Sequence, residues 1–149
     1  MSVLTIRPAQ PLDAGRTGEI LGDAMREHDW MPVLHSRAED IDHMGRMIDL
    51  GWVTVADDGR VRGFMAREDD FIHALYVARG MRGYGIGRRL IETAQVECRR
   101  LELWTFVANT RARRFYEHLG FVETERTDGT RNEENLPDMR YVWTAEAAG

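Results

Sequence analysis

Alternating glycines beside arginines form the segment of this sequence that is best suited to bind an anion. The members of the segment are Arg82, Gly83, Gly85, Gly87, Arg88 and Arg89. Glycines let the backbone adopt positive φ and approach a ligand closely, and the first turn of a helix offers unpaired N–H groups. Arginines add charge-assisted donors. The segment therefore predicts a phosphate site, with a turn that serves only tight packing as the alternative.

The spacing of these glycines argues against a dinucleotide site. The run reads Gly-x-Gly-x-Gly, whereas a dinucleotide-binding turn reads Gly-x-Gly-x-x-Gly and belongs to a strand–helix–strand unit. A dinucleotide-binding enzyme is therefore the third-ranked interpretation, which thermal stabilisation by NAD alone would favour.

A second string of residues contains a phenol among apolar residues at helical spacing. Its members are Asn109, Ala112, Phe115, Tyr116, Gly120 and Phe121. By spacing alone, Tyr116 fills the core, because Ala112 and Leu119 share its side of a helix.

The composition excludes several kinds of chemistry. All 20 basic residues among the 149 are arginine, and the serines are Ser2 and Ser36. A P-loop, a Schiff base and a pyridoxal enzyme each need a lysine, and neither serine lies in a Gly-x-Ser-x-Gly turn. Scattered histidines and a single cysteine, Cys98, predict no metal site and no internal disulfide.

Charge and hydropathy bound the partners and the compartment. A net charge of −5 argues against nonspecific binding to nucleic acid. No apolar run is long enough to span a membrane, and the first residues lack the form of a signal peptide. We therefore expect a cytoplasmic protein with no nucleic-acid or membrane partner.

Periodicity predicts the elements that must position the two strings. Strands are expected at Val3–Arg7, Trp52–Ala56, Val61–Arg67, Phe71–Val77, Glu102–Val107, Phe121–Arg126 and Met139–Thr144. Helices are expected from Asp13 onward, after Ser36, over Ile86–Arg100 and over Thr110–Leu119. The chain thus reads as one mixed α/β (α+β) domain over residues 1–149, without a linker or an internal repeat.

Local signals sharpen three of these elements. Ser36 and Glu39 form a capping box at the start of the second helix. The buried stripe of that helix is expected at Ile41, Met44 and Ile48. The run Phe71–Val77 is apolar on both faces, as expected of a central strand, and Cys98 is expected to point inward as a core thiol.

The two strings together resemble the motifs of the GNAT superfamily, the acyl-CoA-dependent N-acyltransferases. Arg82-x-x-Gly85-x-Gly87 is similar to the family pattern Arg/Gln-x-x-Gly-x-Gly/Ala, and the string from Asn109 to Phe121 is similar to the second family motif. The order of the expected elements also resembles the family. The resemblance implies a mostly antiparallel, twisted sheet of about seven strands flanked by about four helices.

The resemblance also implies binding of coenzyme A. The implied contacts are Leu75, Tyr76, Val77, Arg82, Gly83, Tyr84, Gly85, Ile86, Gly87, Arg88, Asn109, Ala112 and Phe115. The amides of residues 82–87 would cradle the pyrophosphate, and the strand over Leu75–Val77 would pair with the pantetheine arm. In this family the next strand splays away and leaves a cleft for that arm.

Catalytic roles follow from the same resemblance. Tyr116 would protonate the departing coenzyme A thiolate. A backbone N–H at Tyr76 or Val77 would stabilise the oxyanion of the tetrahedral intermediate.

The base that accepts the proton of the amine is expected near the start of the central strand. His73 and Glu68 are the candidates, with Asp69 and Asp70 beside them. By strand alternation, His73 should share a face with Leu75 and Val77. The alternatives are an ordinary half-buried histidine and a solvated acidic turn.

The implied activity is transfer of the acetyl group of acetyl-CoA to a primary amine by direct attack in a ternary complex, without a metal. The alternative is a noncatalytic acyl-CoA-binding or sensing module. The acidic balance favours a cationic small molecule such as a polyamine or an aminoglycoside. Peptide acceptors, including protein N-termini and lysine side chains, and free amino acids stay open, and so does a homodimer.

Two connecting segments are candidates for the acceptor side. Trp30, Met31 and His35 could line the acceptor pocket. The polar segment Thr127–Asp138, with its acidic side chains, could close over an amine, with a solvated hairpin loop as the alternative.

Overall fold

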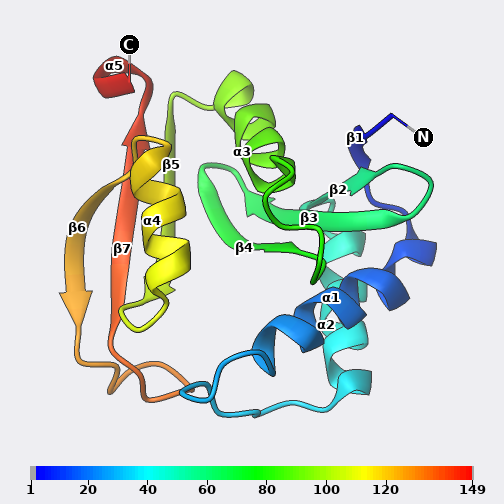
Figure 1. The fold of residues 1–149 in the computed structure, drawn as a ribbon, viewed down its shortest axis with the longest axis horizontal. Helices are drawn as coiled ribbons and strands as arrows, with labels where there is room; N and C mark the ends of the chain where they lie inside the picture. The colour runs from blue at the N-terminus through cyan, green and yellow to red at the C-terminus, as the bar shows by residue number, and fades with distance from the viewer. Residues whose placement is uncertain (1–2, 149) are drawn as a thin grey trace.

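Residues 3–148 are described by the computed structural model, in which seven strands form one sheet (Figure 1). The strands are β1 (Thr5–Pro8), β2 (Val53–Asp57), β3 (Val61–Glu68), β4 (Phe71–Val77), β5 (Arg100–Phe106), β6 (Val122–Thr127) and β7 (Asp138–Thr144). Their order in the sheet is β1-β2-β3-β4-β5-β7-β6. Neighbouring strands run antiparallel except for β4 and β5, which run parallel. The expected mixed α/β fold with a mostly antiparallel sheet is confirmed.

Helices cover both faces of this sheet (Figure 1). They are α1 (Ala14–Met25), α2 (Arg37–Asp49), α3 (Ile86–Glu97), α4 (Thr110–His118) and a short α5 (Ala145–Ala148), with a 3-10 turn at Pro11–Asp13. Ile20 of α1 and Met44 of α2 pack in one apolar cluster, whereas Leu90 of α3 and Tyr116 of α4 pack in the other. Among the described residues, no helix is long and apolar enough to cross a membrane.

The capping box at the start of α2 is confirmed. The Glu39 amide donates to Ser36 Oγ at 3.1 Å, and the Ser36 amide donates to Glu39 Oε1 at 2.9 Å. The expected buried stripe is wrong at Ile41, which is 40% exposed. Asp40 takes the buried position instead, because Arg26 of the neighbouring segment lies 3.3 Å from its carboxylate and offsets its charge.

Replacing Ser36 by alanine is expected to lower the free energy of unfolding by about 1 kcal/mol, because the Glu39 amide loses its acceptor. Urea unfolding measures this change. Ser36→Asp keeps a side-chain acceptor at the cap and should stay within a few tenths of a kcal/mol of the wild type. A Ser36→Ala protein as stable as the wild type would show that the cap contributes nothing.

The expected end of α3 is wrong. The helix ends at Glu97, not at Arg100, because Arg100 already pairs with Thr144 as the first residue of β5. Cys98 follows the helix as a half-buried residue, and its Sγ accepts from Arg67 Nη1 at 3.1 Å. The thiol packs against the core cluster of α3, as the inward position predicts, but it lies at the edge of that cluster and is only partly enclosed.

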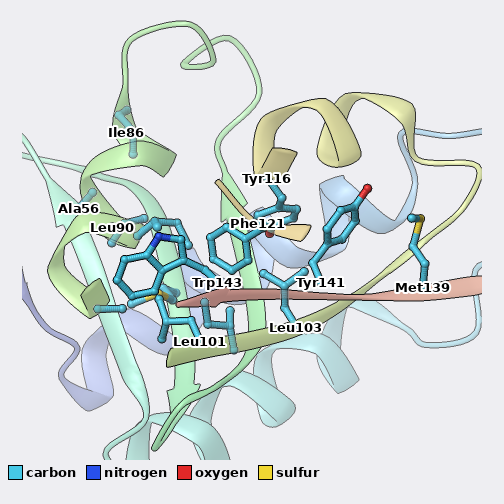
Figure 2. Packing of buried hydrophobic residues seen from close by; sticks show 14 residues of the cluster. Ala56, Ile86, Leu90, Leu101, Leu103, Tyr116, Phe121, Met139, Tyr141 and Trp143 are labelled. Carbon is cyan, nitrogen blue, oxygen red and sulfur yellow. The ribbon is translucent and has the colours of Figure 1, made fainter. Parts of the chain in front are cut away.

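Packing between β5, β7 and α4 fixes the second half of the sheet. The fully buried side chains here are Leu101, Leu103, Met139 and Tyr141, and Figure 2 shows them around Tyr116 and Phe121. Leu101 and Leu103 face α3 and α4, so that the alternate residues of β5 face the side of α1 and α2. The strand thereby presents different side chains to the two faces of the sheet.

The sheet opens between β4 and β5. Only Phe71 with Glu102 and Ile72 with Leu103 are paired there, whereas β3 pairs with β4 along its length. Beyond these pairs the two strands diverge (Figure 1). β4 takes the central fourth place in the sheet as expected, yet most of its side chains are only half-buried, because they border this opening.

Candidate active site

A cleft of about 720 Å³ lies where β4 and β5 separate. Its walls come from these two strands, the glycine turn before α3, the start of α4 and the connection between α1 and α2. The predicted site residues that line it are His73, Leu75, Tyr76, Val77, Arg82, Gly83, Gly85, Ile86, Gly87, Arg88, Asn109, Ala112, Phe115 and Tyr116. Tyr84, which is 73% exposed, and Glu68 are not part of the lining. The fold thus gathers both sequence strings around one cavity.

The glycine turn leaves open space over its backbone. Gly83 has φ +87° and Gly85, the N-cap of α3, has φ +77°, and a Cβ at either position would meet no atom within 4 Å. Gly87 differs, because a Cβ there would lie 3.0 Å from Cζ of Phe115 on α4. Two glycines therefore keep the helix start accessible to a ligand, and the third lets α3 approach α4.

The arginines of this turn are less available than their sequence suggests. Arg82 forms a two-bond ion pair with Glu27, and Nη2 of Arg82 lies 2.7 Å from Oε1. The Arg82 guanidinium holds the pKa of the Glu27 carboxyl below its usual range. Arg89 donates to the backbone oxygen of Leu4 at 3.0 Å. Backbone amides, together with the Arg88 side chain that lines the cleft, are thus the donors that the turn offers to an anion.

Asn109 begins α4 as its N-cap. Its Oδ1 accepts from the Ala112 amide at 3.1 Å, so the carboxamide oxygen serves the helix. The NH₂ group of the same side chain is the part that can bind a ligand in the cleft.

Tyr116 lies at the floor of the cleft and is 7% exposed. Its ring contacts those of Phe115, Phe121 and Tyr141, with centroid distances of 5.1, 5.5 and 6.2 Å. Figure 2 shows Tyr116 beside Phe121 and Tyr141. Burial, with a smaller contribution from Tyr76, raises the pKa of the Tyr116 phenol above its usual value. The hydroxyl therefore stays protonated at neutral pH, which is the state that a proton donor needs before the reaction.

Tyr76 provides a second phenol in the same cleft, which sequence reasoning had considered only for its backbone. Burial, together with the charge of Glu134, raises the pKa of Tyr76 to about 12. The alternation of β4 was the signal that could have revealed it, since Tyr76 and Ala74 pack toward the side of α1 and α2.

His73 does not share a face with Leu75 and Val77, which corrects the expectation from alternation. β3 pairs Ala66 with Ala74 and then Arg67 with Ile72, so that His73 is an extra residue in β4. This bulge breaks the alternation. Leu75 and Val77 pack in the cluster of α3, whereas the His73 ring stacks on Trp52, 4.8 Å between centroids, which belongs to the opposite cluster.

Glu68 reaches the cleft only through His73. Oε1 of Glu68 lies 3.0 Å from His73 Nε2, and His73 lines the cleft. Asp69 and Asp70 are not in the lining, and Asp70 accepts from Arg100 Nη1 at 3.1 Å. Of the acidic residues before the central strand, Glu68 is thus the one in direct contact with a group of the cleft.

Aromatic side chains form the wall of the cleft on the side of α1 and α2. The ring of Trp30 stacks on His28 at 4.6 Å and meets Phe106 edge-on at 6.0 Å. Met31 also lines the cleft, whereas His35 does not. His35 Nε2 instead lies 2.7 Å from Glu133, which joins this connection to the loop between β6 and β7. Sequence reasoning missed His28 and Phe106.

Metal ligands are not gathered in this region. Across residues 3–148, no three side chains of histidine, cysteine, aspartate or glutamate lie close enough together to hold a metal ion. The chemistry that the cleft can offer from its own residues is anion binding at the turn and proton transfer at Tyr116, Tyr76 and His73.

Two curated proteins are similar to this chain in sequence. The chain is 35% identical to the peptidyl-lysine N-acetyltransferase YjaB of Salmonella typhimurium over 52% of this chain and 53% of that protein. It is 39% identical to the 5-NmdU N-acetyltransferase of Pseudomonas phage PaMx11 over 48% of this chain and 58% of that protein. The matches thus span about half the length of these curated relatives.

A solved structure and a family model extend the comparison to most of the chain. The structure of yncA from Salmonella typhimurium with its cofactor acetyl-CoA matches at a TM-score of 0.74 and 19% identity, covering 97% of this chain and 95% of that one. At this identity the match shows the fold alone. Residues 19–121 match the model of the acetyltransferase (GNAT) family. The chain therefore belongs to the acetyltransferase (GNAT) family.

Proposed function

We propose that this protein is an acetyl-CoA-dependent N-acetyltransferase. The observation that carries the proposal is the meeting of the glycine turn and the Tyr116 phenol in one cleft beside an open strand edge. The naming of both curated relatives as N-acetyltransferases and the acetyl-CoA in the structure of yncA support it.

The donor fits the cleft by its chemistry. The pyrophosphate would accept from the amides of the turn around Gly83 and Gly85. The pantetheine arm carries two amides and would lie along the edge of β4 that β5 leaves unpaired, at Leu75–Val77. Asn109 would donate to the same arm.

The reaction proceeds by direct attack of the neutral amine on the thioester carbonyl. The N–C bond forms, the C–S bond breaks, and the thiolate takes the proton of Tyr116. The acylated nitrogen gives up its excess proton, which restores the Tyr116 phenol through solvent. A backbone N–H at Tyr76 or Val77 stabilises the oxyanion. An alkyl ammonium has a pKa of about 10.4, so only about one molecule in a thousand is neutral at pH 7. His73, held by Glu68, accepts the proton of the amine, directly or through water.

Replacing His73 by alanine is expected to lower kcat/KM about tenfold or more, because the amine loses its proton acceptor. Glu68 or a water can take over part of the role, which keeps the effect below that of losing the acid. Steady-state release of thiol measures it. His43→Ala is the matched control, because His43 lies on α2 outside the cleft. Equal losses of kcat/KM in both variants would show that His73 takes no part in the reaction.

The acceptor is a primary amine on a small molecule or a peptide. The names of the two relatives suggest lysine peptides and 5-NmdU as candidate acceptors. The acidic balance of the chain suggests polyamines and aminoglycosides. A screen of these four classes with acetyl-CoA, read by release of free thiol, tests the proposal. Release of thiol with at least one class supports it.

A noncatalytic acyl-CoA-binding module is the second candidate. It predicts tight binding of acetyl-CoA and no thiol release with any amine. The exposed pair of His73 with Glu68 would then be an ordinary structural contact. Binding of acetyl-CoA without thiol release in the screen would favour the noncatalytic module over the enzyme.

A further inference from the structure

The connection between α1 and α2 carries the aromatic wall of the acceptor side. The ring of Trp30 lies between those of His28 and Phe106, and Trp30 itself belongs to no helix or strand. Side chains on a connecting segment are held in place by the contacts that the segment makes with the rest of the molecule. The position of Trp30 therefore depends on how residues 26–36 are attached to the rest of the molecule.

The ends of this connection are attached to the two helices. Arg26 donates to the backbone oxygens of Gly22 and His35, each at 3.0 Å, and to Asp40. These bonds fix where the connection begins and ends. They do not reach the donor side of the cleft.

Glu27 attaches the connection to the glycine turn. Its two carboxylate oxygens bond the two terminal nitrogens of Arg82, a residue 55 positions away in the sequence. The side chains are 14% and 32% exposed, and both residues line the cleft. A paired, half-buried contact of this geometry is stronger and more directional than a surface ion pair. Glu27 and Arg82 thus bridge the donor and acceptor sides.

We propose that Glu27 and Arg82 are positioning residues. When a donor binds and orders the glycine turn, their ion pair also orders residues 26–36, which include Trp30. The inference rests on the proposed function, because it takes the ligand of the turn to be acetyl-CoA. It gives the Arg82 side chain a role on the acceptor side, while the backbone amide of Arg82 stays in the turn.

The physical reason lies in the flexibility of the turn. Gly80, Gly83 and Gly85 all have positive φ, and glycine backbones have many accessible conformations when nothing holds them. A pyrophosphate bound to several amides restricts these conformations. Arg82 then becomes a fixed anchor for Glu27, and an acceptor that binds the connection afterwards loses less conformational entropy.

Amide hydrogen exchange of the full chain, with and without saturating acetyl-CoA, tests this coupling. In the wild type, acetyl-CoA should slow exchange about threefold or more both at residues 82–90 and at residues 28–35. Glu27→Gln keeps the shape of the side chain and removes its charge. In that variant residues 82–90 should still be protected by acetyl-CoA, and residues 28–35 should exchange as in the free protein.

A control variant and a second variant complete the design. Glu146→Gln removes an exposed ion pair with Arg99 at the far end of the chain and should keep the response of residues 28–35. Arg82→Gln removes the same two bonds from the other partner. Because Arg82 lies in the turn that binds the donor, this variant needs two readouts: acetyl-CoA should still protect residues 83–90, and residues 28–35 should lose their protection. If Glu27→Gln fails to fold, these two readouts of Arg82→Gln decide the question.

Three results would overturn the inference. They are persistent protection of residues 28–35 in Glu27→Gln, absence of that protection in the wild type despite donor binding, and loss of acetyl-CoA binding in Glu27→Gln. The last would make Glu27 part of the donor site itself. Failure of the proposed function is seen separately, because the wild type would then bind no acetyl-CoA or release no thiol with any amine.

Discussion

Tyr116→Phe is expected to lower kcat about 10²–10⁴-fold while acetyl-CoA binds with nearly unchanged affinity. The substitution removes one oxygen from a ring that stays packed between Phe115 and Phe121. Because burial raises the pKa of the phenol, the hydroxyl is a proton donor at neutral pH, and phenylalanine offers the departing thiolate no proton. Single-turnover release of thiol and calorimetric titration with acetyl-CoA measure the two quantities.

A second buried tyrosine provides the control for this experiment. Tyr141 packs against Tyr116 and donates to Glu117 Oε2 at 2.5 Å, yet it does not line the cleft. Tyr141→Phe should therefore cost stability and leave kcat unchanged. An unchanged kcat in Tyr116→Phe would end the role of Tyr116 as the acid. A large loss in Tyr76→Phe would then assign the proton to the other phenol of the cleft.

Much of the fold could be predicted from the sequence, because its signals are local. The bounds of β4 follow from the apolar run Phe71–Val77, and the start of α2 follows from the capping box of Ser36 and Glu39. The end of α3 could not be predicted in the same way. Helical periodicity continues past Glu97, and pairing of Arg100 with β7, a contact between distant segments, ends the helix.

The candidate site was predictable where one continuous string supplies its residues. Gly83 and Gly85 lie in one turn, and Asn109 and Tyr116 lie on one helix, so each string needed only a local element to bring its members together. The opening between β4 and β5 then places the two strings at one cleft.

Contacts that depend on register or on distant segments were not predictable. The face of His73 depends on a bulge that only the pairing of β3 with β4 reveals. The partner of Arg82 is Glu27, and nothing in the local sequence of either residue indicates the other. Alternation and motif spacing describe one segment at a time, so they assign Arg82 to the donor alone.

Two arginines of the glycine turn already bond other groups of the protein, so the backbone amides of the turn carry most of the anion binding. Arg82 bonds Glu27 and Arg89 bonds the backbone of Leu4. Arg88 lines the cleft and lies 3.9 Å from Glu92, beyond hydrogen-bond distance, so it is the arginine of the turn that can still add charge beside the amides. Backbone amides need no lysine, which agrees with the composition of the chain. If amides are the main donors, the glycines that expose them should matter more than the arginines around them.

Gly83→Ala and Gly85→Ala are accordingly expected to weaken the binding of acetyl-CoA about 10²-fold. Each places a methyl group in the open space over the turn and disfavours the positive φ that aims the amides. A hydrogen bond to a charged group contributes about 1.5–3 kcal/mol, so loss of one or two such bonds to the pyrophosphate accounts for that factor. Calorimetric titration with acetyl-CoA measures it.

Gly80→Ala separates the loss of the ligand site from backbone strain. Gly80 has φ +87°, the same as Gly83, and a Cβ there also meets no atom within 4 Å, yet Gly80 does not line the cleft. Alanine at positive φ costs about 1–2 kcal/mol at any of the three positions, so the variants should unfold at similar temperatures. Only the variants at Gly83 and Gly85 should lose affinity. An equal loss in Gly80→Ala would mean that acetyl-CoA responds to the flexibility of the whole turn and not to the amides that these two glycines expose.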